Sequence, residues 1–160
     1  MTVKAIIPFL WFNSEAEDAA KFYVSLFPDS KINSLSHYGE GGPGPAGGVM
    51  VVDFQIAGMR LTAMNGGPHF KLDEAFSLLV NCDDQAEIDR LWAALGEGGS
   101  FSMCGWLKDR FGLSWQINYA EMDRLMTGPA AAKVMAAMMT MSKIDIGKLK
   151  DAAGEPAATG

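Results

Sequence analysis

The chain has 160 residues, a net charge of −6 and 49% hydrophobic residues, a balance typical of one globular domain or two small packed modules. It contains no cluster of Lys and Arg that could neutralise phosphates, which excludes a nucleic-acid partner. The longest apolar runs, residues 5–12 and 134–139, are too short to span a bilayer, so we expect no membrane partner either.

The chain opens directly in a strand pattern, residues 4–12, rich in β-branched and aromatic side chains. No charged region, long apolar stretch and cleavage site precede it, so we expect a cytoplasmic protein. A helix follows, for which Ser14 and Glu17 form a capping box that satisfies its first N–H groups. The side chains predicted to form its buried stripe, at three- and four-residue spacing, are Ala19, Phe22, Tyr23 and Leu26.

Three strand-like runs come next, over residues 31–38, 49–57 and 59–64. The first two are separated by a segment rich in glycine and proline, GEGGPGPAGG, at residues 39–48. This segment lacks the Lys-Ser/Thr pair that follows the glycines of a phosphate-binding loop. We therefore expect a flexible lid or a plain hairpin connection.

The second half repeats this plan. It has a strand over residues 76–82, a helix capped by Asp83 and Asp84, and strand-like runs over 100–107 and 113–119. When the two helices are aligned, the buried stripe of the first falls on apolar residues of the second, namely Ile88, Leu91, Trp92 and Leu95. The two cysteines, Cys82 and Cys104, are too few for a disulfide framework and are expected to be reduced thiols.

The repeat predicts an α+β fold built of two tandem βαβββ modules. The modules occupy residues 3–68 and 74–120, within a domain at 1–127. A helical extension is predicted at 128–152, and 153–160 is predicted to be frayed. The extension starts at a proline and carries apolar residues at helical spacing, Val134, Met138, Met141 and Ile144.

Side chains alternate between the two faces of a strand. In the last strand of the second module, Ser114, Gln116 and Asn118 share one face, and apolar side chains occupy the other. In the first strand of that module, Ser77 and Leu79 oppose an apolar set in the same way. Each polar set either lines a wet, concave pocket or faces bulk solvent, and the pattern leaves both possibilities open.

Four stretches spread over both halves form a further pattern: FLWFNSEAEDAAKFYVSLFPDSKI, AMNGGP, VNCDDQAEIDRLWAALGEGG and CGWLKDRFGLSWQI. Together they resemble the PhnB-like family, which is also catalogued as the 3-demethylubiquinone-9 3-methyltransferase domain. That family belongs to the vicinal oxygen chelate superfamily, with glyoxalase I, extradiol dioxygenases and bleomycin-resistance proteins. The resemblance implies that the paired modules form a U-shaped mixed sheet around a ligand trough, and that the protein is a homodimer.

Metal-dependent members of the superfamily place His, Glu or Gln ligands on four concave strand faces. Carried onto this chain, the four positions fall near Pro8, Thr62, Ser77 and Gln116. Proline cannot ligate, and neutral hydroxyl and amide oxygens are poor ligands for Zn, Ni or Fe. We therefore predict a trough without a metal or another cofactor.

The methyltransferase name implies a nucleotide cofactor, which Rossmann-type enzymes bind at a glycine-rich strand-to-helix turn. Both strand-to-helix turns of this chain, residues 12–14 and 81–83, lack glycine. His37 and His69 lie on separate connections, and Cys104 has no basic neighbour in the sequence, so packing or exposed roles are favoured for all three.

The predicted function is binding, or metal-free conversion, of a small amphipathic organic molecule. Two alternatives stay open: a metal-dependent glyoxalase- or dioxygenase-type enzyme, and a protein that sequesters a drug or toxic metabolite. The side chains predicted to contact the ligand combine apolar walls with a few polar groups; they are Leu10, Phe12, Thr62, Met64, Ser77, Leu79, Ser114, Gln116 and Asn118.

Overall fold

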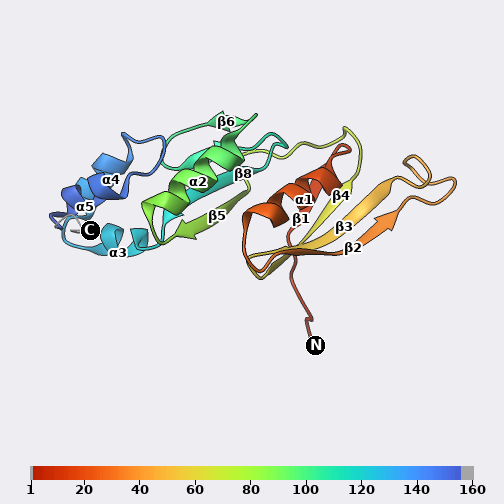
Figure 1. Ribbon diagram of the computed structural model, residues 1–160, viewed down its shortest axis with the longest axis horizontal. Helices are drawn as coiled ribbons and strands as arrows, with labels where there is room; N and C mark the ends of the chain where they lie inside the picture. The colour runs from red at the N-terminus through yellow and green to blue at the C-terminus, as the bar shows by residue number, and fades with distance from the viewer. Residues whose placement is uncertain (1, 156–160) are drawn as a thin grey trace. The chain divides into compact units, whose positions relative to one another are not determined.

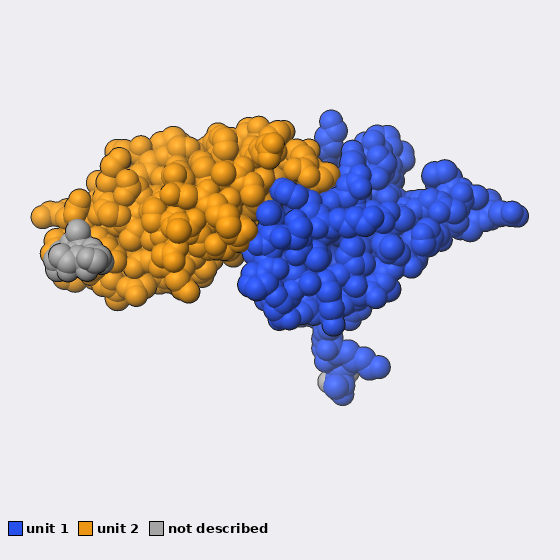
Figure 2. Space-filling model, in the orientation of Figure 1, with its two compact units in different colours: residues 1–72 blue, residues 73–160 orange. Residues whose placement is uncertain are grey.

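The computed structural model describes residues 2–155 of the chain. These residues divide into two compact units, unit 1 at residues 1–72 and unit 2 at residues 73–160 (Figure 2). Each unit contains one four-stranded sheet with a helix across one of its faces (Figure 1). No helix among the described residues is long and apolar enough to cross a membrane.

Unit 1 has the order β-α-β-β-β along the chain. Its elements are β1 (Phe9–Phe12), α1 (Ala16–Leu26), β2 (Lys31–His37), β3 (Val49–Ile56) and β4 (Met59–Asn65). The strands lie in the order β1-β4-β3-β2, and β1 is parallel to β4 while the other pairs are antiparallel. The glycine-rich segment at 39–48 is the hairpin connection between β2 and β3, where the amide of Gly47 donates to the carbonyl of Tyr38.

Unit 2 repeats this order and adds helices at its end. Its elements are β5 (Ser77–Cys82), α2 (Gln85–Gly96), β6 (Ser100–Phe101), β7 (Trp106–Lys108), β8 (Ser114–Tyr119), α3 (Met122–Thr127), α4 (Ala131–Met138) and α5 (Ile146–Ala153). The sheet order is β5-β8-β7-β6, with β5 parallel to β8. The prediction of two tandem βαβββ modules with mixed sheets and C-terminal helices is confirmed.

The core of each unit lies between its helix and one face of its sheet. In unit 1, the buried Tyr23 of α1 stacks on Phe54 of β3, with ring centroids 6.4 Å apart. In unit 2, Trp115 and Ile117 of β8 are fully buried, as is Leu91 of α2. Burial of such side chains contributes roughly 1.5–3 kcal/mol each, so these two layers hold the strands in the register that the site requires.

The first helix begins differently from the prediction. It starts at Ala16, and Ser14 makes no capping bond to it. Instead, the amide of Ala16 donates to the side-chain oxygen of Asn65 over 2.8 Å, from the end of β4. A tertiary contact thus replaces the predicted capping box. The second helix agrees with the prediction, because the side chain of Asp84 accepts the amide of Glu87.

The strand predicted over residues 100–107 is split into β6 and β7. Between them, Cys104 and Gly105 both have positive φ, 58° and 81°. A Cβ on Gly105 would lie 2.6 Å from the carbonyl oxygen of Ile117, so only glycine fits there. This turn brings Trp106 opposite Gln116 of β8.

The C-terminal extension, predicted as helical, consists of two helices. The helix α4 ends at Met138, and α5 starts where the side chain of Asp145 accepts the amide of Lys148. Ala153 closes α5 and Glu155 pairs with Arg124, so the segment predicted to be frayed begins as an ordered turn. Residues 156–160 of that prediction lie outside the described residues.

Candidate functional site

Each sheet has one face under its helix and one face that the helix leaves uncovered, called the open face below. On the open face of unit 2 the strand registers align side chains into rows across the sheet. One row crosses all four strands: Ser77 of β5 pairs with Ser114 of β8, Ser114 with Lys108 of β7, and Lys108 with Ser100 of β6. We call these four residues the hydroxyl–lysine row.

The next row of the open face consists of Leu79, Gln116 and Trp106. The amide of Gln116 reaches back to the first row and donates to the hydroxyl of Ser77 over 2.9 Å. One register position further along, Asn118 donates to the side-chain oxygen of Asn81 over 3.0 Å. The open face therefore combines apolar surface with hydroxyl and amide groups.

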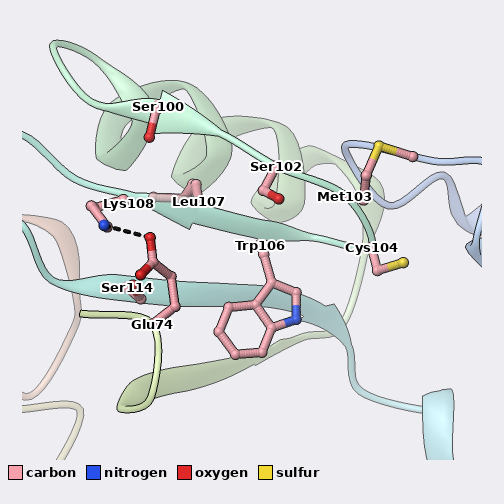
Figure 3. Close-up of a pocket in the computed structure, with 9 residues that line it drawn as sticks. All are labelled: Glu74, Ser100, Ser102, Met103, Cys104, Trp106, Leu107, Lys108 and Ser114. Atoms are coloured by element: carbon pink, nitrogen blue, oxygen red, sulfur yellow. Dashed lines mark ion pairs between the residues drawn. The ribbon is translucent and has the colours of Figure 1, made fainter.

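A cavity of about 370 Å³ lies against this face (Figure 3). Its size is in the range of small-molecule sites. The side chains of Lys108, Ser114 and Trp106 line it from the sheet, and Glu74 lines it from the segment that precedes β5. The remaining lining residues are Ser100, Ser102, Met103, Cys104 and Leu107.

Ser114 is the unusual member of the lining. Its residue is 1% exposed, yet its hydroxyl has no hydrogen-bond partner among the described residues. Buried hydroxyl groups in folded proteins are nearly always paired, because an unpaired one costs about 1–3 kcal/mol. The position is fixed by the preceding turn, where the buried carboxylate of Asp109 accepts the amides of Phe111 and Leu113 and the indole N–H of Trp115.

Glu74 and Lys108 form an ion pair at the cavity (Figure 3). The hydrogen bond from Lys108 lowers the pKa of the Glu74 carboxyl below its ordinary value. The side chain of Glu74 is 66% exposed, whereas that of Lys108 is 33% exposed. The glutamate is thus the more exposed partner, and the lysine is the one that lies in the sheet.

Unit 1 has its own open face, which carries Thr62 and Met64 of β4 opposite Phe9 and Trp11 of β1. A cavity of about 720 Å³ lies at its glycine-rich loops and is lined by Trp11, Tyr38, Met64 and His69 among others. Two of its polar groups are engaged within the unit: the indole N–H of Trp11 donates to the carbonyl of Gly67 over 2.9 Å, and the hydroxyl of Tyr38 donates to the carbonyl of Asn65.

Two predicted ligand-contacting residues lie on the wrong face. Leu10 and Phe12 are 1% and 3% exposed and belong to the core beneath α1. The stretch FLWF is apolar at every position, so its alternation could not reveal which set faces the helix. The pairing of Leu10 with the buried Ala63 decides it, and Trp11 takes the open face instead.

The other predicted residues lie on open faces. Thr62 and Met64 lie on that of unit 1, and Met64 lines its cavity. The five predicted residues of unit 2 share its open face, and among them Ser114 lines the cavity; they are Ser77, Leu79, Ser114, Gln116 and Asn118.

The donor groups at the predicted metal positions do not fit a divalent cation. Ser77 and Gln116 are hydrogen-bonded to each other, and Thr62 lies opposite Phe9 rather than Pro8. The carboxylate nearest to Thr62 in the register, Asp53, is bound by Arg60, which lowers its pKa. No three His, Cys, Asp or Glu side chains gather at one point anywhere in residues 2–155. We derive no chemical step through a metal.

Sequence reasoning missed Glu74, Trp106 and Lys108. The signal for the last two was present, because Trp106 and Lys108 flank the buried Leu107 in the alternation of a strand. The prediction of a single strand over residues 100–107 ended before Lys108, so the alternation of Trp106, Leu107 and Lys108 was not recognised. Glu74 lies outside any strand, so only the folded structure brings it to Lys108.

Comparisons with known proteins agree with the fold described above. The family model described as 3-demethylubiquinone-9 3-methyltransferase matches residues 4–118. A solved PhnB protein from Bacillus cereus is 36% identical over 73% of this chain and 100% of its own, with a TM-score of 0.68. A protein from Pseudomonas aeruginosa is 27% identical over 73% of this chain and 98% of its own, with a TM-score of 0.61.

A more distant neighbour, the fosfomycin resistance protein FosX from Mesorhizobium loti, shares the fold at 14% identity, with a TM-score of 0.54 over 78% of this chain and 98% of its own. No curated protein matches the chain. The match over residues 4–118 and the similarity to the PhnB protein establish that this chain belongs to the PhnB-like, 3-demethylubiquinone-9 3-methyltransferase family of the vicinal oxygen chelate superfamily.

Proposed function

We propose that the chain binds a small amphipathic organic molecule on the open face of unit 2, without a divalent cation to anchor it. The observation that carries this proposal is the cavity beside Trp106 and Ser114, where an aromatic wall meets a buried hydroxyl that has no partner among the described residues. Apolar walls with a few fixed polar groups are the usual composition of a small-molecule site.

Gln116 is the polar group best placed to orient a bound molecule beside this cavity. The side-chain amide nitrogen of Gln116 donates to Ser77. The side-chain oxygen of Gln116, an acceptor with two lone pairs, remains on the open face. Gln116 opposes Trp106 in the register, so a molecule stacked on the indole would lie within reach of the amide. The proposal gives Gln116 an orienting role and no role in bond making.

The experiment is a thermal-shift screen of small organic compounds, followed by calorimetric titration of each compound that raises the melting temperature. Gln116→Ala should weaken binding about three- to tenfold, the loss expected for one hydrogen bond, while the protein stays folded. Asn33→Ala is the matched control, because Asn33 is an exposed amide of unit 1 whose side chain donates to Asp53. Equal affinities in the two variants would contradict the proposal.

The rival functions give different results with the same protein. Stoichiometric Zn, Ni, Fe or Mn in elemental analysis of the purified protein would replace this proposal by a metal-dependent enzyme. Turnover of a bound compound would establish metal-free catalysis, and tight binding without turnover would establish sequestration. Gel filtration with light scattering measures the molar mass in solution and so tests the homodimer that the family resemblance implies.

A further inference from the structure

We propose that the cavity of unit 2 recognises its ligand by an anionic oxyacid group, a carboxylate or a phosphonate, which displaces Glu74 from Lys108. The inference rests on the proposed function, because it assigns the head group of the molecule that the same cavity binds.

The hydroxyl–lysine row supplies the donors that such a group requires. The Cβ atoms of neighbouring residues in a row of a sheet lie roughly 5 Å apart, and Ser114 and Ser100 are the neighbours of Lys108 on either side of it in the row. Both serines and the lysine line the cavity. Together they offer an ammonium with three donors and two hydroxyl donors at one cavity, which matches the several acceptor oxygens of a carboxylate or phosphonate.

The hydroxyl of Ser114 points to a ligand independently of the lysine. It is buried and unpartnered among the described residues, although its strand neighbours on the same face, Ser77 and Lys108, are both hydrogen-bonded or ion-paired. A group of this kind destabilises the fold unless something satisfies it. A ligand oxygen beside Lys108 would accept the hydrogen bond that the protein leaves unmade.

Glu74 occupies the place that the anion would take. Its carboxylate binds Lys108, yet it comes from the segment before β5 and is two-thirds exposed. An ion pair of such an exposed group is worth little, so a ligand anion can replace it at small cost. A cationic ligand would instead have to displace Lys108 from Glu74. This is disfavoured, because Lys108 lies on β7 within the row.

The rest of the cavity indicates the body of the ligand. The indole of Trp106 and the side chain of Met103 line it beyond the charged groups. An aromatic or short alkyl group suits these walls, because indole rings stack on aromatic groups and thioethers contact them favourably. The ligand class is therefore a small aromatic or alkyl acid.

The test uses three probes that share one body and differ in the head group. These are 3-phenylpropionate, the neutral 3-phenylpropanol and the cationic 3-phenylpropylamine, each titrated calorimetrically into the full-length chain. The acid should bind at least tenfold more tightly than the alcohol, and the amine should bind most weakly. 2-Phenylethylphosphonate, which has the same phenylethyl body as 3-phenylpropionate, identifies which oxyacid the row prefers, and inorganic phosphate tests whether the head group alone is sufficient.

Three variants test which residues of the cavity recognise the acid group. Lys108→Gln should lower affinity for the acid at least tenfold, whereas the matched control Lys133→Gln, on the exposed surface of α4, should not change it. Glu74→Gln should raise affinity for the acid about three- to tenfold, since the competing carboxylate is removed. Ser114→Ala should weaken binding of the acid about threefold while leaving the melting temperature equal or higher, because the lost hydroxyl had no partner.

The outcomes separate this inference from the proposed function. If the alcohol or amine binds as tightly as the acids, or if Glu74→Gln weakens binding of the acid, the anionic head group is wrong and the proposed function stands. If none of the aromatic probes binds saturably at millimolar concentration, both are overturned. A lower melting temperature in Ser114→Ala would show that this hydroxyl has a structural role and does not bind the ligand.

Discussion

At the scale of single residues, the two cysteines differ in their surroundings. Cys82 ends β5 beneath α2 and is 2% exposed. Burial, together with the negative charge of Glu87, raises the pKa of its thiol from 9.0 to about 11. Cys104 is partly exposed, and its thiol donates to the carbonyl of Met138 over 3.6 Å. Cys82 is thus a neutral thiol of the core, which is consistent with a packing role.

This raised pKa predicts a pH dependence of stability. The unfolded chain releases the Cys82 proton near pH 9, whereas the folded protein keeps it to about pH 11. The contribution of Cys82 to stability is therefore complete below pH 9 and is lost as the pH rises toward 11. Urea unfolding at several pH values should show a steeper decline for the wild type than for Cys82→Ala between these limits.

The control for this experiment is Cys104→Ala, which keeps Cys82 in place. Its decline should run parallel to that of the wild type, since the buried thiol of Cys82 is the same in both proteins. Parallel curves for all three proteins would contradict the assignment of a buried, protonated Cys82.

Residue patterns predicted which side chains share the open face in unit 2 and failed to do so in β1 of unit 1. In β8, polar Ser114, Gln116 and Asn118 alternate with large apolar side chains, so the pattern itself fixed the face. In β1 all residues are apolar, and only pairing with β4 distinguishes Leu10 from Trp11. Alternation is informative only where the two faces of a strand meet different surroundings.

At the scale of elements, the start of α1 shows a tertiary contact overriding a local signal. Asn65 at the end of β4 accepts the amide of Ala16 and donates to the carbonyl of Val49 over 3.0 Å. One side chain therefore holds the helix to the sheet and the end of β4 to the start of β3. The Ser14-x-x-Glu17 pattern could not indicate this, because Asn65 is distant in sequence.

Asn65→Ala should lower the free energy of unfolding by about 1–3 kcal/mol, because it removes the cap of α1 and leaves two backbone groups without partners. Ser14→Ala, which removes the cap predicted from sequence, should change it by less than about 0.5 kcal/mol. Urea unfolding followed by circular dichroism measures both. A larger loss of stability in Ser14→Ala than in Asn65→Ala would mean that Ser14 caps α1, as the sequence predicted.

At the scale of the whole molecule, the repeat of helix and strand signals was sufficient to predict both βαβββ units. Each half carries the same order of a strand, a helix with an apolar stripe, and three further strands. The C-terminal extension was predicted only as helical. Its break between Met138 and Asp145 depends on where it binds unit 2, which periodicity does not encode.

The break is where the extension contacts the site-forming part of unit 2. The carbonyls of Met141 and Ser142 accept the amides of Cys104 and Gly105, both over 2.7 Å. These two residues form the turn immediately before Trp106, which lines the cavity. The extension therefore supports the turn that places the aromatic wall of the candidate site.

Gln85, at the start of α2, fastens this segment to the unit. Its side chain donates to the carbonyl of Ile144 over 3.0 Å and accepts the amide of Ile146 over 2.9 Å. Gln85→Ala should lower the free energy of unfolding by about 1–3 kcal/mol. Because the extension would detach more often, the amides of Cys104 and Gly105 should exchange their hydrogens faster in hydrogen–deuterium exchange.

Lys143→Ala provides the matched control on the same segment. It removes the ion pair between Lys143 and Asp89, whose side chains are 41% and 49% exposed, and such pairs contribute about 0–1 kcal/mol. Exchange at Cys104 and Gly105 should then remain as in the wild type. Unchanged exchange in Gln85→Ala would mean that the turn before Trp106 is held by β7 and β8 alone, and that the extension does not support the candidate site.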